Sequence, residues 1–206
     1  MKSAVVFGAT GLVGRNVVEQ LLSNDLISSL TVVVRKEFKN SHPKLKCLIL
    51  SDFEYLDNLA EYLFADIFFI CTGTTIKKAG SKEIFYKTDH DLPIKIARLA
   101  ERLNIPVVSV ISSIGANSRS GNFYLRTKGM MENSLKEVYK GDLQIIRPSL
   151  LLGKREEFRF GEFVGALIIK TFGWLMVGPL RKYRGVKACD VASQMISNSL
   201  LLKDNP

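Results

Sequence analysis

The feature that most constrains this chain is a run of three glycines between a buried strand and an amphipathic helix near its start. Residues 4–7 are apolar and rich in β-branched side chains, which predicts a strand buried on both faces. The glycines follow in the pattern G-x-x-G-x-x-G, and apolar residues then recur on one face of a predicted helix. A second apolar run over 30–34 predicts the next strand. This order of strand, glycine turn, helix and strand predicts a parallel α/β unit that binds a dinucleotide.

Each glycine has a physical task in such a unit. Gly8 can adopt the backbone angles of a tight turn. Gly11 has no side chain, so a pyrophosphate can approach the N-terminus of the helix, where unpaired N–H groups and the helix dipole favour an anion. Gly14 allows the helix to pack close to the strand. We therefore expect these three glycines to form a phosphate-binding turn.

The residues after the second predicted strand indicate which dinucleotide is bound. Proteins that bind NAD usually place Asp or Glu there, to hold the ribose 2′-OH. Arg35 and Lys36 occupy this position here, and an arginine can bind a 2′-phosphate with two hydrogen bonds. The sequence therefore predicts NADP(H) in preference to NAD(H).

Four further apolar runs, over 47–50, 66–71, 107–111 and 143–146, predict more strands of the same sheet. The predicted fold class is α/β, a doubly wound, mostly parallel sheet of about seven strands. Ligands of such sheets lie at the carboxyl ends of the strands, so Gly73 and Thr74, after the fourth strand, are expected beside the cofactor. Asp52 and Phe53, after the third, either contact the adenine or begin a helix that Asp52 caps, and both interpretations stay open.

The segment between the fourth and fifth strands predicts a basic loop over 76–81, followed by a helix that ends near Leu103. The start of this helix depends on Pro93. If Asp91 caps the helix, the proline falls in its first turn, where the missing N–H costs little. If the helix begins at Lys82, it is longer and kinked at the proline.

A second group of polar residues follows the fifth strand. Ser112 and Ser113 stand at the strand end, and Tyr124 and Lys128 are four residues apart at the start of the next predicted helix, so they share a face. A nearby ammonium favours the phenolate form of a tyrosine, which suits the phenol to proton transfer near neutral pH. A serine hydroxyl at the strand end would stabilise charge on the same substrate oxygen, and Lys128 could also bond the cofactor ribose.

Composition excludes several other functions. Cys47, Cys71 and Cys189 are isolated from one another, and the chain has only two histidines, so no metal site is expected. Unpaired cysteines fit a reducing compartment, which we interpret as the cytoplasm. The net charge is +9, but the basic residues are scattered along the chain, so we expect an affinity for phosphorylated ligands and no nucleic-acid binding.

The chain is predicted to be a single domain over 1–206, with residues 153–189 forming a small C-terminal helical lid on the substrate side. Residues 163–180 are apolar except for a central lysine and helix-breaking residues, and basic residues follow. A lysine in mid-segment is expensive in hydrocarbon, so we favour an apolar lid over peripheral membrane contact through 163–184. By analogy with related enzymes, the helix of Tyr124 and its neighbour could pair two subunits in a homodimer. A helix capped by Asp190 ends the chain.

Several segments, in order, resemble one family. The segments GATGLVG, CTGTTIKKAG, VISSIGA, FYLRTKGMMENSL and IIRPSLLLG are similar to those of the atypical short-chain dehydrogenase/reductases, and more narrowly of the Tat-interacting-protein oxidoreductase-like subgroup. The resemblance spans nearly the whole chain and implies a Rossmann fold that binds NADPH. The cofactor-binding positions that it implies are Thr10, Gly11, Leu12, Val13, Arg35, Lys36, Gly73, Thr74 and Leu151.

For the chemistry, the resemblance implies Tyr124 as proton donor or acceptor with Lys128 as its partner. By analogy with related reductases it favours Ser113 over Ser112 as the serine that faces the substrate. We therefore predict an NADPH-dependent oxidoreductase that transfers hydride to a small, apolar carbonyl substrate. The alternative is a regulator that binds NADP(H) without catalysis and acts through a protein partner.

Overall fold

The computed structural model describes residues 1–152 and 185–201. Its main sheet has six strands in the order β3-β2-β1-β4-β5-β6, and every neighbouring pair is parallel. These strands are β1 (Lys2–Phe7), β2 (Ile27–Val34), β3 (Leu45–Ile49), β4 (Ile67–Ile70), β5 (Val107–Ile111) and β6 (Asp142–Ile146). A separate two-stranded ribbon pairs β7 (Leu151–Leu152) with β8 (Val186–Lys187). The strand order is that of a doubly wound dinucleotide-binding sheet and confirms the predicted fold class.

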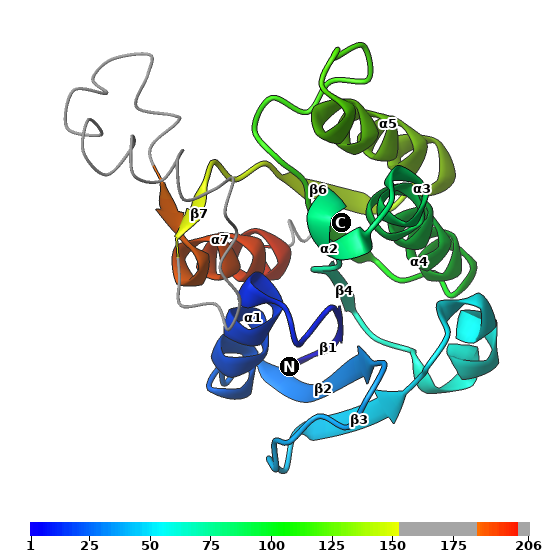
Figure 1. Ribbon diagram of the computed structural model, residues 1–206. Helices are drawn as coiled ribbons and strands as arrows, with labels where there is room; N and C mark the ends of the chain where they lie inside the picture. Colours follow the sequence, from blue (N-terminus) through cyan, green and yellow to red (C-terminus); the bar gives the residue numbers. More distant parts are fainter. Residues whose placement is uncertain (153–184, 202–206) are drawn as a thin grey trace.

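Helices cover both faces of this sheet (Figure 1). One face packs against α1 (Leu12–Leu22) and α7 (Ala188–Leu200), and the other against η1 (Phe53–Tyr62), α4 (Leu92–Arg102) and α5 (Phe123–Val138). Side chains along β1 alternate between the two resulting cores: Ala4 and Val6 belong to the first, Val5 and Phe7 to the second. The central strands are therefore apolar on both faces, as expected for a parallel sheet between two helical layers.

The segment between β4 and β5 differs from its prediction in one respect. Residues 76–79, expected in a loop, form the short helix α2 (Ile76–Ala79), whose first turn is capped by the Thr75 hydroxyl accepting from the N–H of Lys78 at 3.1 Å. Next, α3 (Lys82–Tyr86), the π-helical turn η2 (Lys87–Asp91) and α4 run on without interruption. The longer of the two predicted helices is therefore present, and Pro93 sits in the first turn of α4, after the π turn.

Helix α5 begins where it can present the predicted catalytic pair. The Asn122 side chain accepts from the N–H of Leu125 at 3.2 Å and caps the helix. Tyr124 therefore lies in the first turn and Lys128 one turn further on. Helix α7 begins at Ala188 after Lys187, so Asp190 lies in its first turn and is not its cap as predicted.

The predicted lid falls almost entirely on 153–184, outside the described residues, and so does segment 163–184, for which membrane contact was the less favoured interpretation. Among the helices of 1–152 and 185–201, none combines the length and the apolarity needed to cross a bilayer.

Candidate dinucleotide-binding and catalytic site

The glycine turn joins β1 to α1 at the carboxyl edge of the sheet, where β1 and β4 lie side by side. Gly8 has φ +82°, and a Cβ there would lie 2.6 Å from the carbonyl carbon and oxygen of Cys71. A Cβ at Gly14 would lie 2.1 Å from the carbonyl oxygen of Gly8. These two positions require glycine, because α1 begins in direct contact with the turn and with the end of β4.

The N-terminus of α1 has no acceptor of its own. Gly11 is its N-cap and supplies no side chain, and no acidic residue lies in its first turn. By contrast, η1, α2, α3 and α5 each begin with a side chain that accepts from the first turn. Thr10 and Gly11 are exposed, Leu12 is part-buried, and Val13 packs into the core below. The end of α1 can thus accept an external anion, as a pyrophosphate site requires.

A nicotinamide dinucleotide fits this edge of the sheet. The order of the strands reverses between β1 and β4, which is where such ligands bind in doubly wound folds. The Thr72 hydroxyl lies there, buried and with no hydrogen-bond partner in the described part of the chain. A buried hydroxyl without a partner is costly, and a polar ligand at the glycine turn would supply one.

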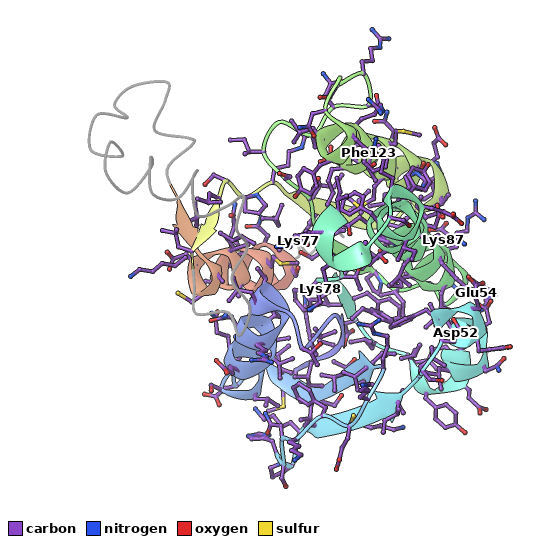
Figure 2. The ribbon with its side chains drawn as sticks, in the orientation of Figure 1. Asp52, Glu54, Lys77, Lys78, Lys87 and Phe123 are labelled. Atoms are coloured by element: carbon purple, nitrogen blue, oxygen red, sulfur yellow. The ribbon has the colours of Figure 1, made fainter. Side chains whose placement is uncertain are left out.

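The residues expected around the adenosine half lie along the same edge. Arg35 and Lys36 follow β2 directly and are exposed. Asp52 lies after β3, and its carboxylate accepts from the N–H of Glu54 at 2.9 Å (Figure 2). The capping interpretation of Asp52 therefore holds, while its exposed carboxylate stays accessible. Phe53 is part-buried against the core beneath η1 and α4.

Lys128 is the centre of a buried polar cluster at the end of β4. Its ammonium pairs with Asp89 of η2 at 2.8 Å, and both side chains are almost fully buried. The other oxygen of Asp89 accepts from the N–H of Thr74 at 2.8 Å. A Cβ at Gly73 would lie 3.3 Å from Asp89 and 4.0 Å from the ammonium of Lys128. The structure thus brings together Gly73, Thr74 and Lys128, and adds Asp89, which was not predicted.

Tyr124 lies on the same face of α5, nearer to its N-terminus. It is part-buried, and its ring packs on that of Phe85 with centroids 5.8 Å apart. Within the described residues no hydrogen bond joins its hydroxyl to Lys128, whose ammonium faces Asp89. Figure 2 shows the neighbouring Phe123 at the start of α5, and that ring also contacts Phe85, with centroids 5.8 Å apart.

The two serines after β5 differ in their surroundings. Ser112 is buried and donates to Glu132 at 2.5 Å. Glu132 also accepts two hydrogen bonds from Arg147 at the end of β6. These hydrogen bonds, and to a smaller extent the negative charge of Glu132, raise the pKa of the Arg147 guanidinium, although its burial acts in the opposite direction. Ser113 is part-buried, and within 1–152 and 185–201 the one hydrogen bond of its hydroxyl is donated to the carbonyl oxygen of Ile114 at 3.3 Å. Its hydroxyl is therefore the more available of the two.

Two buried carboxylates of this cluster, Asp89 and Glu132, were missed in the sequence. Asp89 belongs to the polar run TDHD, which resembles a solvated helix face, and Glu132 follows Lys128 by four residues, the spacing of a surface ion pair. Neither pattern signals burial. Leu151, predicted beside the nicotinamide, is part-buried in β7, where it pairs with Val186.

The strand order, the uncapped α1 behind a glycine turn, and a tyrosine and lysine on the helix after β5 define a class: a Rossmann protein of the short-chain dehydrogenase/reductase type. A family model described as NAD(P)H-binding matches residues 8–152. The chain belongs to this NAD(P)H-binding family, among the atypical short-chain dehydrogenase/reductases. A nicotinamide dinucleotide is accordingly its class of cofactor.

Relatives support the predicted subgroup. "Protein FMP52, mitochondrial" of Candida albicans is 35% identical over 175 residues, which cover 83% of this chain and 75% of the relative. "Protein HTATIP2" of Rattus norvegicus is 33% identical over 178 residues, which cover 84% of this chain and 72% of the relative. The resemblance stated from the motifs is confirmed.

Solved structures share the fold. The enzyme WbmH of Bordetella bronchiseptica, solved with NAD+, matches with a TM-score of 0.74 at 14% identity over 98% of this chain and 73% of its own. A short-chain dehydrogenase/reductase of Veillonella parvula has a TM-score of 0.68 at 14% identity, covering 100% of this chain and 89% of its own. The match to WbmG of B. bronchiseptica, with a TM-score of 0.64 at 13% identity, covers 80% of this chain and 60% of that enzyme. At these identities the likeness shows the fold alone.

The prediction of a cytoplasmic protein is wrong. Relatives from Candida albicans, Emericella nidulans and Coccidioides immitis are each named mitochondrial. The prediction rested on unpaired cysteines, which distinguish a reducing compartment from an oxidising one. They do not distinguish one reducing compartment from another.

Proposed function

We propose that this chain is an NADPH-dependent oxidoreductase that reduces a small, apolar carbonyl compound, or runs the reverse oxidation. The observation that carries the proposal is the position of Lys128, buried against the Gly73–Thr74 turn and one helical turn from Tyr124. An ammonium at this place can contact the ribose next to the nicotinamide and can also stabilise a phenolate. The apolar run over 163–180 supports an apolar substrate.

The preference for NADPH is supported by charge at the end of β2. Arg35 and Lys36 are exposed at the strand end next to the glycine turn, where the ribose of the adenosine half would lie. A 2′-phosphate there would gain a bidentate hydrogen-bonded contact from the guanidinium. Arg35→Ala should therefore weaken NADPH binding much more than NADH binding, and equal losses would contradict the preference.

In the proposed reaction the reduced nicotinamide, when bound, supplies a hydride to the carbonyl carbon. Tyr124 donates its phenolic proton to the carbonyl oxygen, which becomes a hydroxyl. Ser113 donates a hydrogen bond to the same oxygen and stabilises the charge that develops on it. Lys128 stabilises the phenolate that remains on Tyr124 and holds the ribose in place. We further propose that the whole chain acts as one domain.

The test is turnover by a Tyr124→Phe variant. NADPH oxidation is followed with a panel of aldehydes, ketones and quinones, and NADPH affinity is measured in parallel. Loss of the proton donor should lower kcat by about 100-fold or more, since general acid catalysis contributes ~10²–10⁴-fold, with unchanged NADPH affinity. Tyr55→Phe, which removes an exposed hydroxyl on η1, is the matched control. Undiminished turnover by Tyr124→Phe would remove Tyr124 from the mechanism.

The second candidate is a regulator that binds NADP(H) without catalysis. It is favoured by the ion pair of Lys128 with Asp89, which engages the ammonium, whereas no hydrogen bond joins that ammonium to the Tyr124 hydroxyl in the described residues. This candidate predicts tight binding of NADPH, no turnover across the panel, and no effect of Tyr124→Phe on any measured property. The same experiment therefore separates the two functions.

A further inference from the structure

The π turn η2 places two consecutive polar residues inside the protein. Asp89 and His90 are both buried, whereas Thr88 is part-buried and Lys87 and Asp91 are exposed. Asp89 lies four residues after Phe85 and four before Pro93, which are also buried, so it falls on the inner face of this helical segment. π turns of this kind are frequent at functional sites. Here the Asp89 carboxylate lies under the turn that follows β4.

Both oxygens of Asp89 are used. One binds the Lys128 ammonium at 2.8 Å, and the other accepts from the N–H of Thr74 at 2.8 Å. Gly73 lies directly over the pair, because a Cβ there would come within 3.3 Å of the carboxylate. Asp89 thus connects helix α5 to the segment at the end of β4.

The charges of this pair depend on each other. The exposed fractions are 3% for the Lys128 side chain and 1% for Asp89. A buried ammonium that loses its counter-charge is strongly destabilised and favours the neutral amine. An amide in place of the carboxylate could still accept from Thr74, but it could not neutralise Lys128.

We propose that Asp89 is a positioning residue, which holds Lys128 charged and fixed and holds the Gly73–Thr74 turn against it. The subsite for the ribose next to the nicotinamide is then formed before the dinucleotide binds. This inference rests on the proposed function, because it requires that a bound dinucleotide contacts Lys128.

Other titratable groups surround the pair, and the test must separate their effects. On η2, His90 contacts Asp91 at 2.7 Å and stacks on Tyr86 of α3, whose pKa is raised by burial and by Asp91. On α5, Tyr124 lies one turn before Lys128, and Glu132, which binds Arg147 of the β6 end, lies one turn after. On the β4 side, burial raises the pKa of Cys71 to about 12. All of these groups are retained in the variants below, except Asp91, which only the control variant replaces.

The experiment measures the NADPH dissociation constant by fluorescence between pH 6.5 and 9.5. The proteins are the wild type, Asp89→Asn, Lys128→Met and Asp89→Asn/Lys128→Met. The ratio of the Asp89→Asn constant to the wild-type constant should rise at least fivefold across this range, because the unpaired amine loses its proton as the pH rises. In the Lys128→Met background, the same substitution should give a ratio independent of pH. Asp91→Asn, which alters a neighbouring exposed carboxylate, is the matched control and should also give a flat ratio.

The outcomes separate this inference from the proposed function. A wild-type protein that binds neither NADPH nor NADH overturns both. Two results would overturn only the role of Asp89, provided that the wild type binds NADPH. The first is an Asp89→Asn to wild-type ratio of NADPH dissociation constants that does not change with pH. The second is a ratio that still rises with pH when Asp89→Asn is made in the Lys128→Met background. If Asp89→Asn does not fold, the double variant should fold, because it contains no unpaired charge. A double variant that is equally unfolded would assign Asp89 a purely structural role.

Discussion

Gly11 and Gly14 of the turn should respond differently to substitution by alanine. In Gly14→Ala the new Cβ would lie 2.1 Å from the carbonyl oxygen of Gly8 and 3.1 Å from the Cα of Ala9. In Gly11→Ala the nearest atom, the same carbonyl oxygen, lies 3.2 Å away, and the position is exposed. Gly14→Ala should therefore damage the fold, whereas Gly11→Ala should damage only the ligand site.

The magnitudes follow from these distances. Helix α1 would have to retreat by about 1 Å before a methyl group at Gly14 reached even 3.0 Å from that oxygen. Overpacking costs about 1–3 kcal/mol, and an overlap of this size belongs at the upper end of that range, about 2–3 kcal/mol. About 1 kcal/mol of this is offset because alanine is the better residue inside a helix. The net loss of unfolding free energy should be about 1–2 kcal/mol. Alanine in place of glycine at an N-cap costs about 0.5 kcal/mol, so Gly11→Ala should be nearly neutral.

The assays are urea unfolding and NADPH binding. With a urea dependence of about 2–3 kcal/mol per molar for a chain of this size, Gly14→Ala should lower the unfolding midpoint by roughly 0.5 M. Gly11→Ala should leave the midpoint unchanged and weaken NADPH binding more than tenfold, because its methyl group occupies the approach of the pyrophosphate. A Gly14→Ala protein as stable as the wild type would refute the close packing of α1. Unchanged NADPH affinity in Gly11→Ala would refute the location of the pyrophosphate.

Three other predictions concern pH, a buried network and thiol reactivity. Burial opposes the ionisation of Asp66, but hydrogen bonds from the N–H and hydroxyl of Ser3 outweigh it and lower its pKa. Asp66→Asn should therefore reduce stability to urea at pH 7, and the difference should vanish as the pH falls below the ordinary carboxyl value of 3.8. Glu132→Gln should cost about 1.5–3 kcal/mol in urea unfolding, the range for hydrogen bonds to a charged group, and the exposed Glu137→Gln should cost nearly nothing. Because burial raises the pKa of Cys71 to about 12, an aromatic disulfide reagent at pH 8 should modify the exposed Cys47 quickly and Cys71 only on unfolding. Rapid modification of Cys71 in Cys47→Ser would contradict its burial.

The parts of the fold that the sequence predicts are those determined locally. The strand, glycine turn and helix over 4–22 are specified by neighbouring residues. The shared face of Tyr124 and Lys128 follows from helical spacing alone. Each of these predictions depends on residues within one or two turns of each other.

The burial of Asp89 could not be predicted in the same way, because it depends on partners that are distant in the sequence. Nothing within residues 82–102 indicates what would neutralise a buried carboxylate. Asp89 meets Lys128 and the N–H of Thr74, which come from distant parts of the chain. Glu132 was missed for a related reason: four residues after Lys128, it binds Ser112 and Arg147 instead of the lysine.

These two carboxylates explain which polar side chain on the inner face of α5 is left without a partner in the described part of the chain. Tyr124, Lys128 and Glu132 are spaced four residues apart, so they form one stripe along the helix. Lys128 is bound through Asp89 to the end of β4, and Glu132 is bound to the ends of β5 and β6 through Ser112 and Arg147. Opposite charges on consecutive turns are thus each neutralised by a partner from another element, which fixes the helix against the carboxyl edge of the sheet. Tyr124 packs its ring on Phe85 and is the residue of this stripe whose polar atom has no partner in the described part of the chain.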